Sequence, residues 1–139
     1  MFGKILLGLD GSPESYKALK KAIEIAKHLG LGLDTISVDE VPNFPSPAGK
    51  MMRDGAIESS KFGAVVHNAR ELAKKEGVEI HCHGIMGNEV KAIIEFIKKY
   101  RFDLLVIGVP GQPSLGDWDG GITGLGLIRL APCSVLVAK

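Results

Sequence analysis

The sequence predicts an α/β fold in which one open, mostly parallel sheet of five strands carries helices on both faces. Two observations support this prediction. Short apolar runs of strand length alternate along the chain with longer segments whose apolar residues recur every three or four positions. Turn residues such as glycine, proline, aspartate and asparagine separate these segments. Regular alternation of strands and helices is typical of a parallel sheet whose strands are joined by helices.

The first half of the chain begins with a strand, a tight turn and a helix. Residues 4–10 form a short apolar run, which is followed by Ser12 as a plausible N-cap and by Pro13 at the first helical position. The apolar positions of the helix then recur until Gly30 ends the pattern. Residues 31–38 predict a second strand, which should pair in parallel with the first through a right-handed crossover.

Residues 39–57 interrupt the regular pattern. They contain three prolines and two glycines, which are too many breakers for a regular element. A loop of this length inside a compact domain is often functional, so we consider a lid over a ligand and a contact between subunits as its possible roles.

The second half of the chain repeats the alternation. Residues 78–85 alternate in polarity, which predicts a strand at an edge of the sheet or in a half-exposed position. The other predicted elements are a helix at 58–76, a helix that begins at 87–88, a strand at 102–108, a helix at 120–130 and a strand at 134–138.

A glycine-rich turn follows the most apolar strand. Gly108 and Gly111 come directly after this strand, and Gly120 and Gly121 open the next helix. Glycine lets the backbone approach a ligand closely, and a helix N-terminus presents N–H groups to an anion. The turn therefore predicts a phosphate-bearing ligand. Ligands of open parallel sheets lie outside the carboxyl ends of the strands, so the ends of the first two strands should face the same site.

Composition excludes several classes of protein. Seventeen Lys and Arg against sixteen Asp and Glu give a net charge of +1, without the basic run that nucleic-acid binding would need. No apolar stretch approaches the ~20 residues of a membrane helix, and the N-terminal apolar run is shorter than that of a signal peptide. We therefore expect a cytoplasmic protein that binds neither nucleic acid nor membrane. Cys82 and Cys133 form no CxxC pair and are expected to be small buried apolar residues.

Six segments carry a resemblance to a known family. They read KILLGLDGS at the start, ISVDE after the second strand, GVEI and MGNEVKAII around the third, DLLVIG, and APCSVLVAK at the end. With these segments residues 1–139 resemble one domain of the universal stress protein family. The resemblance implies a Rossmann-like sheet of the adenine nucleotide alpha hydrolase-like type. The nucleotide signature of the family is a glycine, two residues, a glycine, nine residues, then glycine followed by Ser or Thr, and Gly108, Gly111 and Gly121 fit this spacing.

The resemblance implies a site for ATP, and Mg²⁺ is the ion considered with it. In ATP-binding members an aspartate at the end of the first strand meets the nucleoside, main chain at the ends of the first two strands borders the adenine, and the glycines meet ribose and phosphates. On this chain the implied binding positions are Leu9, Asp10, Ser37, Val38, Ile107, Gly108, Gly111, Gly121, Ile122 and Thr123. We predict no catalytic residue and no metal ligand.

The chain departs from the family signature in its glycine-rich segment. Ile122 stands where the signature has Ser or Thr, and Thr123 follows one position later. No Lys or Arg lies between Gly108 and Ile128. The segment instead carries Asp117 and Asp119, which would repel a triphosphate unless a divalent cation lies between them.

Three functional hypotheses follow from these patterns. The first is a nucleotide-binding regulatory protein involved in stress response, which acts as a homodimeric switch and dimerises, as the resemblance implies, through residues 134–138. The second is a dimeric interaction module of the same family that binds no ATP and uses the glycine-rich loop and Trp118 for a partner. The third is a slow ATPase that depends on a metal held by Asp117 or Asp119.

Two groups of candidate residues also have simpler interpretations. Asp10 can cap the turn that precedes the first helix. His81, Cys82 and His83 resemble a metal site, but alternate residues of a strand face opposite sides and no third ligand is evident, so a structural role is favoured.

Overall fold

The computed structural model describes residues 2–109 and 120–139, with only the backbone described for residues 120–123. Its strands are β1 (Ile5–Gly8), β2 (Leu33–Glu40), β3 (Lys50–Met51), β4 (Ile80–Gly87), β5 (Leu104–Gly108) and β6 (Ser134–Ala138). Its helices are α1 (Pro13–Leu29), α2 (Ala56–Ser59), α3 (Gly63–Lys75), α4 (Glu89–Tyr100) and α5 (Gly120–Leu130). None of the described helices is long and apolar enough to cross a bilayer.

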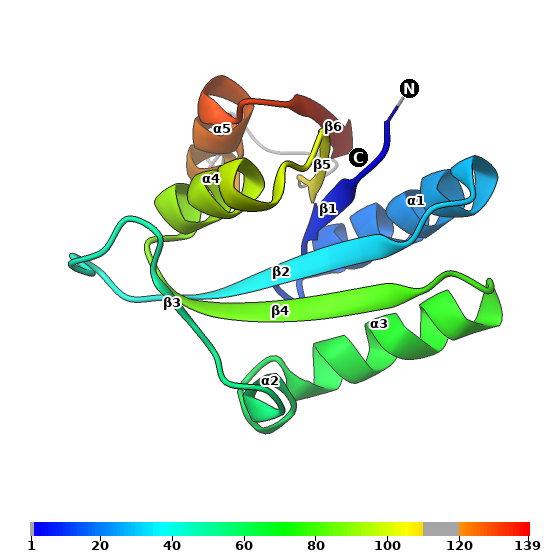
Figure 1. The fold of residues 1–139 in the computed structure, drawn as a ribbon, viewed down its shortest axis with the longest axis horizontal. Coiled ribbons are helices and arrows are strands. Elements are labelled where there is room, and N and C mark those ends of the chain that lie inside the picture. The colour runs from blue at the N-terminus through cyan, green and yellow to red at the C-terminus, as the bar shows by residue number, and fades with distance from the viewer. Residues whose placement is uncertain (1, 110–119) are drawn as a thin grey trace.

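The described strands form one sheet in the order β3-β4-β2-β1-β5-β6. All neighbours pair in parallel except β3 and β4, which are antiparallel. One apolar core packs α1 and α3 against one face of the sheet, and a second core packs α4 and α5 against the other (Figure 1). The predicted fold class, a mostly parallel α/β sheet with helices on both faces, is confirmed.

The sixth strand, β3, lies within the segment that the sequence predicts to be a loop. It contains only two residues, and Lys50 and Met51 pair with Met86 and Ile85 of β4. A two-residue strand shows no periodicity, so the predicted count of five strands is wrong by this one element. β3 covers the edge of β4 only at Ile85 and Met86, and residues 80–83 of β4, before this pairing, are half-exposed or exposed, in agreement with the predicted half-exposed position.

The helix predicted at 58–76 is divided into α2 and α3. Ser60 adopts an extended backbone between them, its hydroxyl donates to the carbonyl of Ile57, and the same oxygen accepts from the N–H of Phe62. These side-chain hydrogen bonds locally replace the backbone hydrogen bonds of a continuous helix. The apolar side chains on both sides of the break remain buried, as Ile57, Phe62 and Val66 show. The apolar spacing therefore continues across the break and does not reveal it.

The predicted helix ends are confirmed where local side chains determine them. The hydroxyl of Ser12 accepts from the N–H of Ser15 at 3.1 Å, with Pro13 as the first residue of α1. Gly30 ends α1 in a left-handed conformation, with φ of +67°. Asn88 caps α4, because its side-chain oxygen accepts from the N–H of Lys91 at 3.0 Å.

The order of the strands places a switch point between β1 and β5. From β1 the chain proceeds through β2 and β4 on one side, then returns to β5 and β6 on the other. Both central strands are buried on their two faces, as Leu6, Leu7, Leu105 and Val106 show with 0% exposure. In open parallel sheets this switch point leaves a crevice at the carboxyl ends of the strands.

Candidate functional site

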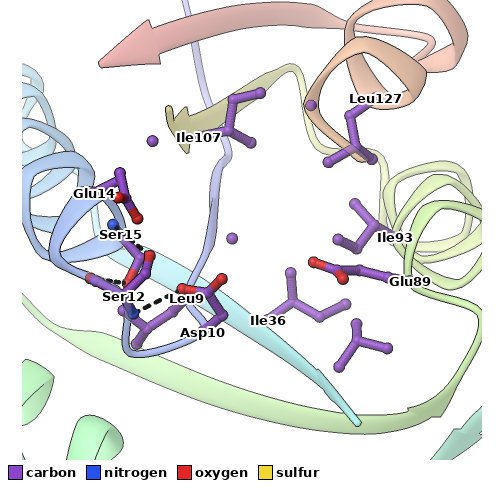
Figure 2. A pocket seen from close by; sticks show the side chains of 14 residues that line it. Leu9, Asp10, Ser12, Glu14, Ser15, Ile36, Glu89, Ile93, Ile107 and Leu127 are labelled. Atoms are coloured by element: carbon purple, nitrogen blue, oxygen red, sulfur yellow. Dashed lines mark hydrogen bonds between the residues drawn. The ribbon is translucent and has the colours of Figure 1, made fainter. Parts of the chain in front are cut away.

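A pocket of about 170 Å³ lies at this switch point, between the carboxyl ends of the central strands and the first turns of α1 and α4 (Figure 2). The ends of β1, β2 and β5 form its floor, and α5 contributes Gly124 and Leu127. Its lining residues are Gly8, Leu9, Asp10, Ser12, Glu14, Ser15, Ile36, Val38, Glu89, Ile93, Ile107, Gly108, Gly124 and Leu127.

Asp10 caps the turn before α1 and also lines the pocket, the two roles that the sequence leaves as alternatives. Its Oδ1 accepts from the N–H of Ser12 at 2.9 Å, which is the turn-capping bond of an aspartate before a helix. Its carboxyl group is also exposed on the pocket wall (Figure 2). The loop is held further by Ser15, whose hydroxyl accepts from the N–H of Gly11 and donates to the carbonyl of Ser12. The capping bond therefore fixes a carboxylate that faces a ligand pocket.

Ser37 lies behind the pocket wall. Ile36 and Val38 of β2 line the pocket, and Ser37 between them points to the other face of the sheet. The hydroxyl of Ser37 is 1% exposed and donates to the carbonyl of Leu9 at 2.6 Å, while the N–H of Leu9 donates to the carbonyl of Ile36. Ser37 thus positions the main chain of Leu9, which does line the pocket.

Gly108 is the point at which the end of β5 contacts the start of α1. A Cβ at this position would collide with the carbonyl oxygen of Glu14. Only glycine therefore lets the end of β5 approach the first turn of α1 this closely, and this contact closes one side of the pocket. Ile107, immediately before it, is 5% exposed and contributes apolar wall.

The remaining predicted positions lie in or after the glycine-rich segment. Gly111, Asp117, Trp118 and Asp119 lie outside the described residues. Gly121, Ile122 and Thr123 belong to the first turn of α5, and their side chains are not described. The structure therefore brings five predicted residues together on the pocket wall: Leu9, Asp10, Val38, Ile107 and Gly108.

Glu89 is a pocket residue that the sequence reasoning does not identify. It is the first residue of α4, and its carboxyl group points into the pocket from the wall opposite Asp10 (Figure 2). Burial and, to a smaller extent, the nearby carboxylates of Asp10 and Glu40 together raise the pKa of this carboxyl group to about 7, against the opposing effect of Lys61. The sequence offers one signal for the role of Glu89 in the pocket, an acidic residue directly after a helix N-cap at the end of a strand. An acidic residue at that position is also explained by the helix dipole alone.

The pocket combines acidic groups with apolar walls. Asp10, Glu14 and Glu89 are the ionisable residues of its described lining, which includes no Lys, Arg or His. Six branched apolar residues complete the described walls: Leu9, Ile36, Val38, Ile93, Ile107 and Leu127. Among the described residues, no group of three or more His, Cys, Asp or Glu side chains could hold a metal ion. The described walls therefore suit an apolar ring that carries hydrogen-bonding groups at its edge.

The residues of the His-Cys-His segment in β4 each have protein partners. His81 Nε2 lies 2.9 Å from a carboxylate oxygen of Glu79, and His83 Nε2 lies 2.7 Å from one of Asp34. The ring of His83 also packs against Phe96, at 5.0 Å between centroids. Cys82 points to the other face of the sheet and packs against the core under α1 and α3. These contacts agree with the structural interpretation of the segment.

The sheet order and the pocket at its switch point define an α/β protein of the class that binds ligands at the carboxyl ends of parallel strands. A sequence model described as the Universal stress protein family matches residues 1–139, so the chain belongs to the universal stress protein family. It is 31% identical over 141 residues to the universal stress protein MJ0531 of Methanocaldococcus jannaschii, covering 100% of this chain and 83% of that relative.

Solved structures of the same family share the fold. A universal stress protein in complex with cAMP superimposes with a TM-score of 0.74 at 24% identity, covering 99% of this chain and 97% of the other. A universal stress protein family protein from Arabidopsis thaliana with AMP bound gives a TM-score of 0.70 at 16% identity, covering 99% and 90%. These similarities establish the fold of the present chain independently of its sequence pattern.

Proposed function

We propose that this chain is a regulatory protein that binds an adenine nucleotide in the pocket at the switch point. The observation that carries the proposal is the pocket itself, where predicted nucleotide-binding residues from three strand ends converge around apolar walls. Family members whose structures contain cAMP or AMP support the choice of an adenine nucleotide. ATP, with Mg²⁺ on its phosphates, is the nucleotide that the resemblance implies.

The chemistry of the wall suggests how the nucleotide would be held. The described pocket is smaller than the ~300 to 1,000 Å³ typical of whole small-molecule sites, so it suits the base and part of the sugar. Ile36, Ile93 and Leu127 would pack against the ring, and Asp10 would accept hydrogen bonds from the nucleoside. The first turn of α5, with Gly121, would offer backbone N–H groups to phosphate.

A bulky residue at position 124 tests the proposed site. Gly124 lies within α5 on the pocket wall, and a Cβ there would meet Val109 and Ile107 only at 3.7 and 3.8 Å. We expect Gly124→Leu to fold and to bind AMP at least about tenfold more weakly, since its side chain fills pocket space, a loss of about 1.4 kcal/mol. Isothermal titration calorimetry with AMP, cAMP and Mg-ATP measures the affinities.

The matched control for this variant is Leu125→Ala, which changes the neighbouring residue of α5. Leu125 is 41% exposed and is not among the pocket residues. Equal affinities for wild type and Gly124→Leu, with both proteins folded, would reject the pocket as the nucleotide site. Failure of all three nucleotides to bind wild type would reject nucleotide binding altogether.

We further propose that the regulatory unit is a homodimer formed through β6. In the described part of the chain β6 pairs only with β5, so its outer edge offers unpaired backbone groups to a second copy. Nucleotide binding would then shift the dimer between conformations or partners, provided that its affinity differs between those states.

A charged residue on the β6 edge tests the dimer. We expect Ser134→Lys, at the exposed first residue of β6, to raise the dissociation constant of the dimer by at least about tenfold, because lysine on an edge strand opposes edge-to-edge pairing. Sedimentation velocity over a range of concentrations measures it. Met51→Lys makes a comparable change on β3, at the opposite edge of the sheet, and should leave the dimer intact. A wild-type protein that remains monomeric at high micromolar concentration would contradict the proposal.

The acidic lining favours one alternative, a dimeric interaction module without ATP. The charged residues on the described pocket wall, Asp10, Glu14 and Glu89, are all acidic and would disfavour a triphosphate placed close to them. In that case the exposed apolar side chains of α5, Leu125, Ile128 and Leu130, would be candidates for a partner surface. Slow metal-dependent hydrolysis of ATP rests on Asp117 and Asp119, outside the described residues, and stays a prediction from the sequence.

A further inference from the structure

Two carboxyl groups face each other across the pocket. Asp10 extends from the end of β1 and Glu89 from the first turn of α4, and Figure 2 shows both pointing toward the middle of the pocket. Branched apolar side chains flank them, with Ile93 one turn further along α4 and Ile36 on the floor. A flat ligand that packs against these side chains would present its edge to one or both carboxyl groups.

The surroundings of Glu89 differ from those of an ordinary surface glutamate. Its own N–H donates to Glu40 at the end of β2, so a second carboxylate lies beside it, and Asp10 and Glu14 face it from β1 and α1. Lys61, between α2 and α3, is the nearby cation, and it is ion-paired with Asp39 at 3.2 Å. The described pocket residues of β5 and α5 carry no charge. Burial and the carboxylates of Asp10 and Glu40 raise the pKa of Glu89 to about 7.

We propose that Glu89 recognises the base in this pocket, and that its protonated carboxyl group pairs with adenine by donating to a ring nitrogen and accepting from the adjacent amino group. This inference rests on the proposed binding of an adenine nucleotide. It adds to that function a specificity-determining residue, outside the glycine signature and outside the residues that the resemblance implies.

The hydrogen-bonding pattern explains why the protonated form matters. A protonated carboxyl group offers one donor and one acceptor, whereas an ionised one only accepts. Adenine presents an acceptor nitrogen beside an amino donor, so it matches the protonated form. Guanine presents two adjacent donors, N1–H and its amino group, which match the two acceptors of an ionised carboxylate, and its O6 beside N1–H also matches a protonated carboxyl group. Ionisation of Glu89 therefore removes its pairing with adenine and leaves a pairing with guanine, so the preference between the two bases changes with pH.

The proposal predicts that adenine binding and proton binding are linked. If the ligand binds only the protonated form, affinity falls by up to about tenfold per pH unit above the pKa of the free protein. Cyclic nucleotides are suitable probes, because cAMP and cGMP each keep a single negative charge between pH 6 and 8. The described lining of the pocket holds no histidine, the residue that would otherwise titrate in this range.

The experiment is calorimetric titration of the full chain with cAMP and cGMP at pH 6, 7 and 8. We expect wild type to bind cAMP about tenfold more weakly at pH 8 than at pH 6. Glu89→Gln keeps a donor and an acceptor without a proton to lose, so it should bind cAMP about tenfold more tightly than wild type at pH 8. Glu89→Ala should lose both the pH dependence of cAMP binding and the pH dependence of the ratio between the cAMP and cGMP affinities.

Glu95→Gln is the matched control, since Glu95 lies on the same helix, is 43% exposed and pairs with Lys98. Its affinities and pH profile should equal those of wild type. Binding of cAMP by wild type that does not change with pH, or that is unaltered in Glu89→Ala, would overturn the role of Glu89 and leave the proposed function intact. Failure of cAMP, AMP and ATP to bind wild type at any pH would overturn both.

Discussion

Gly108→Ala is expected to destabilise the protein by about 3 kcal/mol. The reason is local and steric: the new methyl group would collide with the carbonyl oxygen of Glu14. The atom it meets belongs to backbone that is fixed by the capping bonds at the start of α1, where Ser12 and Ser15 bond to each other's main chain. The collision can therefore be relieved only by moving β5 away from α1, which disturbs the core under both elements.

Urea denaturation followed by circular dichroism measures this free energy of unfolding. Gly8→Ala is the matched control, because Gly8 is also the last residue of a central strand and also lines the pocket. A Cβ at position 8 would meet Ile107 at 3.8 Å, an ordinary contact, so this variant should change stability by less than about 1 kcal/mol. Equal stability of the two variants would show that β5 and α1 can separate at little cost.

The same contact shows how much a glycine indicates when only the sequence is considered. The strand followed by Gly108 predicts close approach of the backbone to a phosphate-bearing ligand. In the structure the close approach is to the first turn of α1, and it shapes the pocket wall. A glycine in the sequence indicates that something comes near the backbone, but the identity of that neighbour depends on which segments the fold brings together.

Much of the fold could be predicted because its signals are local. Ser12, Pro13 and Gly30 act within one turn of the helix that they begin or end, and Asn88 does the same for α4. The apolar runs of β1 and β5 predict strands, which the structure confirms, and the central residues of both strands are 0% exposed. These features need no information about distant parts of the chain.

The features that the sequence did not reveal depend on partners far along the chain. β3 exists only because Lys50 and Met51 reach the edge of β4, more than 30 residues later. The role of Ser37 depends on the carbonyl of Leu9, 28 residues earlier. Glu89 reads in the sequence as a favourable acidic residue in the first turn of a helix, and only the fold places Asp10 and Glu40 near it.

Glu89 should also make the stability of the unliganded protein depend on pH. Its pKa is about 7 in the folded protein and 4.5 as the ordinary value. Between these pH values the folded state binds a proton that the unfolded state has lost, so the free energy of unfolding falls as pH rises from about 4.5 through 7. Above pH 7 the carboxylate is ionised within a partly buried, acidic pocket, and the loss in the free energy of unfolding is complete.

Glu89→Gln should therefore stabilise the unliganded protein at pH 8 and have little effect near pH 4.5. The shift in pKa corresponds to at most about 3 kcal/mol, and partial exposure to solvent and loss of a favourable charge at the helix N-terminus reduce the expected gain to about 1 to 2 kcal/mol. Urea denaturation of wild type, Glu89→Gln and Glu95→Gln at pH 5, 6.5 and 8 measures it. A stabilisation by Glu89→Gln that is equal at all three pH values would show that the carboxyl group of folded wild type is ionised throughout this range, and would remove the proton on which base recognition depends.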